Sequence, residues 1–153
     1  MKLSTILKNM LFTVAIPGTV GIYLPLWVGR QAERHAGFWN WLAYPLLAAG
    51  IGVLLLCVWD FANKGEGTPF PLDPPRNLVT GRLYEFSRNP MYLGVLTTIA
   101  GWVFWYSTVL MAGYWLLVFL LFSLFVVKVE EPGLKKQFGS AYEAYCKKVP
   151  RWF

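Results

Sequence analysis

The sequence predicts an all-α integral membrane protein with about four transmembrane helices and a C-terminal amphipathic helix on the cytoplasmic side. Two observations lead to this fold class. The chain of 153 residues is 56% hydrophobic and only 14% charged, about half the charged share of an average soluble domain. The few charges are also unevenly placed, because three long stretches contain none. This composition excludes a soluble globular enzyme and an intrinsically disordered chain.

The uncharged stretches are residues 9–29, 36–59 and 91–127. A helix needs about 20 residues to cross the hydrocarbon core of a bilayer, so each of the first two stretches fits one crossing. The third has 37 residues and would extend about 55 Å as a single helix, which is too long. It therefore predicts a hairpin with spans over 90–106 and 108–128 and a turn at 106–108. The first span is too long for a cleaved signal peptide and lacks its small-residue cleavage site.

The basic residues predict the orientation of these spans. If both termini are cytoplasmic, the loop over 60–89 and the residues after 128 also lie inside. Twelve of the 14 Lys and Arg residues are then cytoplasmic, and only Arg30 and Arg34 lie outside, as the positive-inside rule requires. Orientation and contact with anionic lipid account for the net charge of +6, so no nucleic-acid partner is implied.

No metal site or disulfide is predicted. Cys57 falls in an apolar helix and Cys146 in the cytoplasmic tail, without metal-ligand spacing, and a reducing compartment disfavours a bond between them. The only histidine, His35, is expected to be a solvated residue of the outer loop. The small residues fit close helix contacts either within one chain or between two chains. They are Gly18, Gly21, Gly50 and Gly52.

The cytoplasmic loop carries the first polar cluster that could support chemistry. Residues 65–75 are too rich in Pro and Gly for a helix or strand, and Phe70 and Leu72 alternate with prolines, which favours an ordered strap. Arg88 and Tyr92 then stand at the entry of the third span. They fit either an interfacial anchor or the wall of a polar pocket.

The C-terminal segment is predicted to form one amphipathic helix over 132–148. Its apolar stripe has helical spacing and consists of Leu134, Phe138, Tyr142 and Tyr145. Pro132 suits the first helical position. Because a proline disfavours the α conformation of the residue before it, we expect a break in the helix at Glu131. Free amides beside a carboxylate at such a break suit a zwitterionic ligand.

Several motifs in this half of the chain resemble one family. R-N-P-M-Y-L-G at 88–94 resembles the R-[H/N]-P-x-Y-x-G signature of integral-membrane methyltransferases, which include isoprenylcysteine carboxyl methyltransferase and the phospholipid N-methyltransferases. Later motifs of this chain resemble the C-terminal block of the same family. They are E-E-x-x-L at 130–134, F-G at 138–139, Y-x-x-Y at 142–145 and V-P-R at 149–151. The upstream G-T-P-F-P-L-D-P-P-R-N-L-V-T-G resembles small prokaryotic members. The resemblance covers about residues 60–152.

The resemblance implies a methyltransferase of a prokaryotic inner membrane that uses S-adenosyl-L-methionine on the cytoplasmic side. Its acceptor would be lipophilic and enter from the bilayer. An isoprenylcysteine-like carboxylate ranks first, with a phospholipid amine and a small lipophilic thiol as alternatives. The catalytic residues carried over are Arg88, Glu131 and Arg151. The cofactor-binding residues carried over are Asn89, Pro90, Tyr92, Leu93, Gly94, Glu130, Glu131, Tyr142 and Tyr145.

The residue chemistry agrees with this donor. Glutamates can pair with its ammonium group and ribose hydroxyls, Arg88 can bind its carboxylate, and tyrosines can pack on adenine or the sulfonium. Asn89 stands where many relatives carry His, so a titratable base is missing at that position. A small four-helix transporter is disfavoured because no predicted span holds an ionisable residue. A nicotinamide-dependent membrane reductase would need more polar surface than this chain offers.

Overall fold

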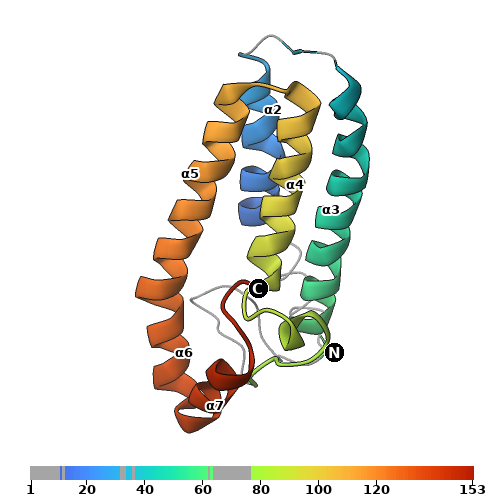
Figure 1. Cartoon of the computed structure of the whole chain (residues 1–153). Helices are drawn as coiled ribbons and strands as arrows, with labels where there is room; N and C mark the ends of the chain where they lie inside the picture. The colour runs from blue at the N-terminus through green and yellow to red at the C-terminus, as the bar shows by residue number, and fades with distance from the viewer. Residues whose placement is uncertain (1–10, 12, 32–33, 36, 62, 64–76) are drawn as a thin grey trace.

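The computed structural model describes residues 11, 13–31, 34–35, 37–61, 63 and 77–153. These residues form helices and connecting turns, without a strand among them, so the predicted all-α class is confirmed. Figure 1 shows the long helical segments side by side, with α6 (Glu131–Phe138) and α7 (Ser140–Lys148) at one end. The predicted strap over 65–75 and the start of the first predicted span lie outside the described residues.

The first segment is a continuous helix made of η1 (Val14–Tyr23), which is π-helical, and α2 (Leu24–Gly29). Pro17 lies inside η1, and a proline removes one backbone hydrogen bond from a helix. Carbonyl groups of η1 are bound by side chains of later helices. Trp102 Nε1 donates to Gly21 O at 2.9 Å, and Tyr114 Oη donates to Val20 O at 2.7 Å. These bonds tie the first segment to the rest of the bundle.

The second and third segments pack backbone against backbone. They are η2 (Phe38–Leu42) with α3 (Ala43–Asp60), and α4 (Pro90–Tyr106). A Cβ atom added to Gly50 on α3 would lie 2.5 Å from Thr98 N on α4. A Cβ atom added to Gly101 would lie 2.7 Å from Leu47 Cγ. Gly50 thus allows a close contact between two helices of the same chain, whereas a Cβ atom on Gly52 would meet nothing within 4 Å.

The C-terminal end of α4 is capped by the loop before α3. The Asn40 side chain is buried and donates from Nδ2 to Phe104 O at 2.6 Å and to Trp105 O at 3.0 Å. Arg34 adds a bond from Nε to Trp105 O at 3.2 Å. His35 is exposed, as predicted, and its backbone amide donates to Tyr106 O. The four last carbonyls of a helix have no partner within the helix, and this loop supplies several.

The fourth segment continues past the end of the uncharged stretch without a break. α5 (Val109–Phe125) runs through the π-helical turn η5 (Val126–Glu130) into α6 (Glu131–Phe138). The predicted break at Glu131 is therefore wrong, because this residue has φ −61° and ψ −44°. A proline ring clashes with the carbonyl four residues earlier in a regular α-helix, and for Pro132 that carbonyl belongs to Lys128. The wider turn of η5 includes Lys128 and accommodates the ring.

The prediction of one helix over 132–148 is also wrong. The segment forms two helices, α6 and α7 (Ser140–Lys148), which meet at Gly139. Gly139 has φ +52° and ψ −126°, a conformation that only glycine adopts readily. The chain therefore turns back here, and α7 packs under the bundle (Figure 1).

Two helical segments are long and apolar enough to cross a membrane, Phe38–Asp60 and Val109–Phe138, and Val14–Gly29 is a shorter apolar segment. α4 covers 90–106, the range predicted for the third helix. The outward side of α5 exposes a row of leucines, as a lipid-facing helix does. They are Leu110, Leu116, Leu117, Leu120, Leu121 and Leu124. These features favour an integral membrane protein.

Candidate functional site

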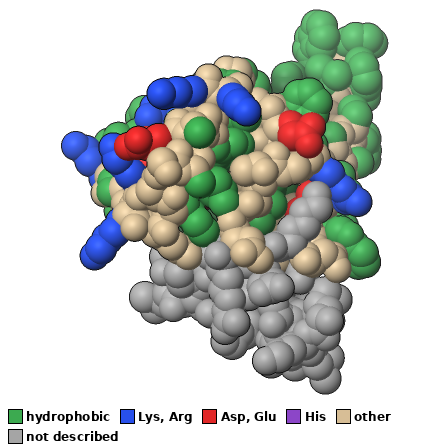
Figure 2. Space-filling view, turned by 90° about the horizontal axis from the view of Figure 1, so that it is seen from below, with side chains coloured by type: hydrophobic (Ala, Val, Ile, Leu, Met, Phe, Trp, Pro, Cys, Tyr) green, Lys and Arg blue, Asp and Glu red, His purple; other side chains and the backbone are tan. Residues whose placement is uncertain are grey.

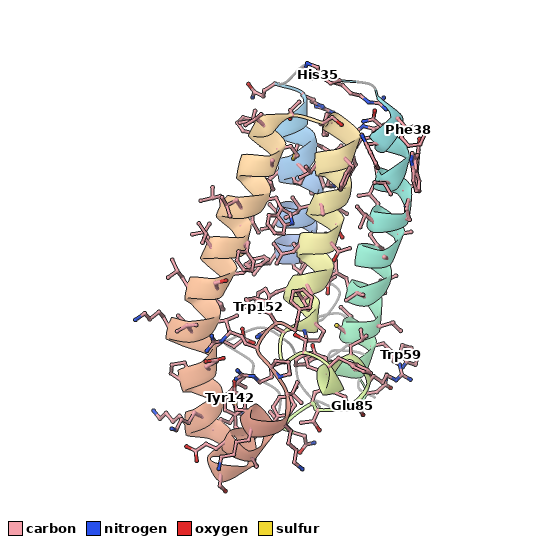
Figure 3. The ribbon with its side chains drawn as sticks, in the orientation of Figure 1. His35, Phe38, Trp59, Glu85, Tyr142 and Trp152 are labelled. Atoms are coloured by element: carbon pink, nitrogen blue, oxygen red, sulfur yellow. The ribbon has the colours of Figure 1, made fainter. Side chains whose placement is uncertain are left out.

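A small pocket, with several polar side chains in a largely apolar lining, lies where the lower ends of α3 and α4 meet α6 and α7. It encloses about 70 Å³. Its lining consists of Phe61, Leu78, Val79, Tyr84, Arg88, Asn89, Glu130, Glu131, Leu134, Tyr142 and Tyr145. Figure 3 places Tyr142 and Glu85 at this end of the bundle and His35 at the other. Figure 2, seen from below, shows Lys and Arg side chains around the margin of this end.

Glu131 is held between two arginines. Arg88 Nη1 lies 3.0 Å from Glu131 Oε1. Arg151 binds the same carboxylate at two points, with Nε 2.7 Å from Oε1 and Nη2 3.0 Å from Oε2. The hydrogen bonds from Arg151, followed by the charge of Arg88, hold the pKa of Glu131 below its usual range. Glu131 is therefore ionised at neutral pH, and arginine nitrogens bind both of its carboxylate oxygens.

Arg88 joins α6 to α7 from the entry of α4. Its Nη1 donates to Cys146 Sγ at 2.9 Å and to Tyr142 Oη at 3.4 Å, besides its ion pair with Glu131. The Nε atom is buried and has no hydrogen-bond partner among the described residues. A buried guanidinium N–H without an acceptor is costly, and Arg88 lines the pocket. One donor of this cation is thus available to a ligand.

Glu130 lies next to Glu131 in the chain but in different surroundings. Its Oε2 accepts a hydrogen bond from Tyr92 Oη at 2.8 Å. Among the described residues no Lys or Arg forms an ion pair with it. Desolvation of the carboxyl group raises the pKa of Glu130, and the charge of Glu131 adds to this effect. The two adjacent carboxyl groups therefore differ in basicity.

The C-terminal tail, residues 149–153, docks against the entry of α4. Arg88 N donates to Pro150 O at 3.0 Å. Asn89 Nδ2 and Ser87 Oγ donate to Arg151 O at 3.0 Å and 3.2 Å. Trp152 then lies between α4 and α5 (Figure 3), with its ring 5.8 Å from that of Phe119. The Asn89 amide thus holds the tail in place.

Aromatic side chains form the opposite wall of the pocket. Tyr142 and Tyr145 are buried on α7, and Tyr145 Oη donates to Tyr84 O at 2.6 Å. The ring of Phe61 lies edge-on to that of Tyr84 at 5.7 Å. Desolvation raises the pKa of Tyr145 to about 12, so its phenol is neutral at physiological pH. The predicted apolar stripe does face inward, with Leu134, although it spans two helices.

The structure brings together six of the sequence-predicted site residues in the pocket wall. They are Arg88, Asn89, Glu130, Glu131, Tyr142 and Tyr145. Tyr92 reaches the site through its bond to Glu130, and Arg151 reaches it through Glu131.

Three other predicted cofactor contacts, besides Tyr92, lie outside the pocket wall. Pro90 begins α4, and Leu93 donates its backbone amide to Asn89 O. Gly94 faces α3, because an added Cβ atom would lie 3.1 Å from Gly50 O. These positions of the motif form and pack the start of α4.

Four lining residues were missed by the sequence reasoning. They are Phe61, Leu78, Val79 and Tyr84. Leu78 and Val79 belong to the upstream motif over 67–81, to which no site role was assigned, and Phe61 and Tyr84 belong to no motif. Leu78 and Val79 form an apolar pair in a loop otherwise read as soluble, which indicates a segment that covers another surface.

Comparison with protein families identifies a known domain that includes most of the pocket lining, although Tyr142 and Tyr145 lie beyond its end. Residues 38–141 match the family model described as phospholipid methyltransferase (PEMT). The match covers about two thirds of the chain and includes α3, α4, α5 and α6. No curated protein and no solved structure matches the chain.

Proposed function

Because the chain belongs to the phospholipid methyltransferase family and is an S-adenosylmethionine-dependent membrane methyltransferase, we propose that the polar pocket binds the methyl donor. The proposed acceptor is a lipid that reaches the pocket from the cytoplasmic leaflet. The observation that carries this proposal is the unlike pair of carboxyl groups, Glu130 and Glu131, beside a buried arginine with one unused donor.

The residues of the pocket fit the donor's chemical groups. Arg88 Nε–H has no acceptor among the described residues, and a carboxylate would satisfy it by a charge-assisted bond. Tyr142 and Tyr145 offer aromatic rings, which favour adenine stacking or a sulfonium. When bound, the donor supplies an activated methyl group for an in-line displacement.

The protein contributes position and exclusion of water. Methyl transfer needs no covalent enzyme intermediate, so orientation and desolvation can supply much of the rate enhancement. The pocket of about 70 Å³ is smaller than the roughly 300 Å³ at the lower end for small-molecule sites. Binding therefore requires the lining to move apart, and α7 is the natural moving part because Gly139 connects it to α6.

The charge of the pocket favours a phospholipid amine as acceptor. Glu130 lines the pocket without a cationic partner among the described residues, and an ammonium group would complement it. A carboxylate acceptor would bring a like charge toward Glu130. The isoprenylcysteine-like carboxylate, ranked first by the resemblance, is the second candidate, and the unused Nε–H of Arg88 favours it.

The proposed topology has four crossings and cytoplasmic termini. The segments are Val14–Gly29, Phe38–Asp60, α4 and the apolar part of Val109–Phe138. This arrangement puts the pocket at the cytoplasmic interface, where twelve of the 14 basic residues also lie in the predicted orientation. A donor from the cytosol and an acceptor from the leaflet could then meet at one site.

The function is tested with the purified protein in proteoliposomes of phosphatidylethanolamine and phosphatidylcholine, supplied with methyl-labelled donor. Label that mild base releases as volatile methanol indicates an ester, and label that stays in the non-volatile headgroup indicates an N-methyl product. S-adenosylhomocysteine should raise the melting temperature of the protein. Arg88→Gln should weaken that binding by about 10- to 100-fold, the value of a hydrogen bond to a charged group.

Glu143→Gln is the matched control for loss of one charge. Glu143 is exposed on α7 and pairs with Lys135 outside the pocket, so the variant should bind the product as the parent protein does. Absence of any stabilisation of the parent protein by S-adenosylhomocysteine would contradict the proposed donor site.

A further inference from the structure

We propose that Glu130 is the proton acceptor of the reaction and that Glu131, its neighbour, is a positioning residue. The inference rests on the proposed function, because it requires an acceptor that loses a proton, here the ammonium group of a phospholipid. It assigns different roles to two residues that the family resemblance treats as one acidic pair.

The geometry separates the two carboxyl groups. Glu131 has guanidinium nitrogens within 3.0 Å of both oxygens, from Arg88 and Arg151. A carboxylate held by two cations is a poor proton acceptor, because protonation would break both contacts. Glu130 accepts a hydrogen bond from the Tyr92 hydroxyl and lines the pocket. It can therefore accept a proton without losing an ion pair to any residue that the structure describes.

The electrostatic surroundings act in the same direction. Desolvation, with the nearby charge of Glu131, raises the pKa of Glu130, while Arg151 and Arg88 lower the pKa of Glu131. Paired titratable groups whose surroundings move their pKa values apart are typical of acid–base sites. A base whose pKa lies closer to the working pH also transfers protons more effectively.

The groups that face Glu130 come from every element around the pocket. Tyr92 on α4 donates the hydrogen bond, and Tyr84 of η4 (Arg82–Glu85) lies near enough for its pKa to be raised by the charge of Glu130. Glu131 is the adjacent anion. The remaining polar members of the lining are Arg88, Asn89, Tyr142 and Tyr145. The cation in this set, Arg88, is engaged by Glu131.

The proposed step is balanced. The Glu130 carboxylate takes one proton from the ammonium nitrogen and becomes a neutral carboxylic acid. The freed nitrogen lone pair forms a bond to the methyl carbon while the carbon–sulfur bond of the donor breaks, and the electron pair of that bond remains on sulfur. The products are a methylated amine, which is charged again when protonated, and S-adenosylhomocysteine.

Asn89 of the pocket wall cannot take this role. The Asn89 amide donates to Arg151 O and cannot titrate. Another group of the pocket wall must then accept the proton. Glu130 lines this wall, and its carboxyl group forms no ion pair among the described residues.

The test is the pH dependence of kcat/KM in phosphatidylethanolamine proteoliposomes for the parent protein, Glu130→Gln and Tyr92→Phe. Glu130→Gln should lower kcat/KM at pH 7 by about 10²- to 10⁴-fold, the range for loss of a general base. The loss should shrink as the pH rises and the acceptor amine deprotonates in solution. Tyr92→Phe removes a bond that lowers the pKa of Glu130, so the acidic limb of its profile should move to higher pH.

Product binding separates this inference from the proposed function. S-adenosylhomocysteine should stabilise Glu130→Gln within a few-fold of its affinity for the parent protein. If that affinity falls as far as kcat/KM does, Glu130 is a donor ligand and the inference is wrong. A flat ratio of variant to parent activity across pH also overturns it. Failure of the product to bind the parent protein, or a base-labile product, overturns the proposed function instead. Glu143→Gln serves again as the charge control.

Discussion

Arg151 and Glu131 form a two-point ion pair, with Nε to Oε1 at 2.7 Å and Nη2 to Oε2 at 3.0 Å. The carbonyl of the same arginine accepts hydrogen bonds from Ser87 and Asn89. One residue of the tail thus connects the entry of α4 to the start of α6. This connection holds Glu131 in place and, through it, the guanidinium of Arg88.

Replacement of Arg151 should loosen the tail. Arg151→Leu removes the ion pair, and Arg151→Lys cannot reproduce its planar two-point geometry. A partly exposed pair of this kind contributes about 1 kcal/mol. The backbone amide of Arg88 reports on docking because it donates to Pro150 O, so its hydrogen exchange should become faster in both variants. Lys147→Leu, an exposed change on α7, is the control, and unchanged Arg88 exchange in Arg151→Leu would contradict the docking role.

Tail docking should weaken in acid. Arg151 and Arg88 lower the pKa of Glu131 in the folded protein, so ionised Glu131 stabilises the docked tail at pH values above the ordinary glutamate pKa. This stabilisation is lost as the pH falls through the lowered value, where the carboxylate takes a proton. Arg88 amide exchange, corrected for intrinsic rate, should rise between about pH 5 and pH 3. In Glu131→Gln, the Arg88 amide should exchange fast at every pH in this range. A pH-dependent rise of the exchange rate in that variant would assign the effect to another group.

The contact between α3 and α4 should not tolerate a methyl group. In Gly50→Ala the new Cβ atom would lie 2.5 Å from Thr98 N and 2.7 Å from Gly94 O, and backbone atoms cannot rotate away. We expect a loss of roughly 1–3 kcal/mol, measured as a lower melting temperature in detergent. Gly52→Ala on the same helix meets nothing within 4 Å and should be neutral or stabilising by up to about 1 kcal/mol. Equal melting temperatures for the two variants would show that the helices are not packed this closely.

Asn40 should be a strong determinant of stability at the C-terminal end of α4. Asn40→Ala removes one donor from each of the carbonyls of Phe104 and Trp105, which keep Ser107 Oγ and Arg34 Nε as donors, and each lost hydrogen bond costs about 0.5–1.5 kcal/mol. The melting temperature in detergent should therefore fall. Asn63→Ala is the control, since Asn63 is exposed and bonds to Trp59 O one turn earlier. Methyl transfer per folded molecule should be unchanged in both, because neither residue lines the pocket.

Patterns that depend on one segment could be predicted from the sequence. The all-α class and the range of α4 follow from the uncharged stretches and from Pro90, which suits a helix start. The turn after α4 follows from the length of the third stretch, and Ser107 does adopt a left-handed conformation there. The inward stripe on α7 follows from the spacing of Tyr142 and Tyr145.

Features that depend on how segments meet could not be predicted. A proline rule that holds for regular helices predicted a break at Glu131, but the π-helical turn of η5 accommodates Pro132. The motif placed Gly94 with the cofactor residues, whereas its missing side chain admits α3. Nothing local indicates that Arg151 binds Glu131 across 20 positions, or that Glu130 and Glu131 differ in environment. Those outcomes depend on the contacts that α6 makes with the C-terminal tail and with α4. The sequence alone does not show which residues of these segments meet.

The π-helical turn η5 also restricts how the length of this helix can change in evolution. Successive residues of an α-helix point about 100° apart, so a one-residue deletion within Val126–Glu130 would rotate all later side chains by that angle relative to α5. The helix would stay continuous, yet Glu130 would leave Tyr92 and Glu131 would leave the arginines. Insertions and deletions should therefore be absent between Phe125 and Glu131 in relatives that keep this site, even where the lipid-facing leucines vary freely.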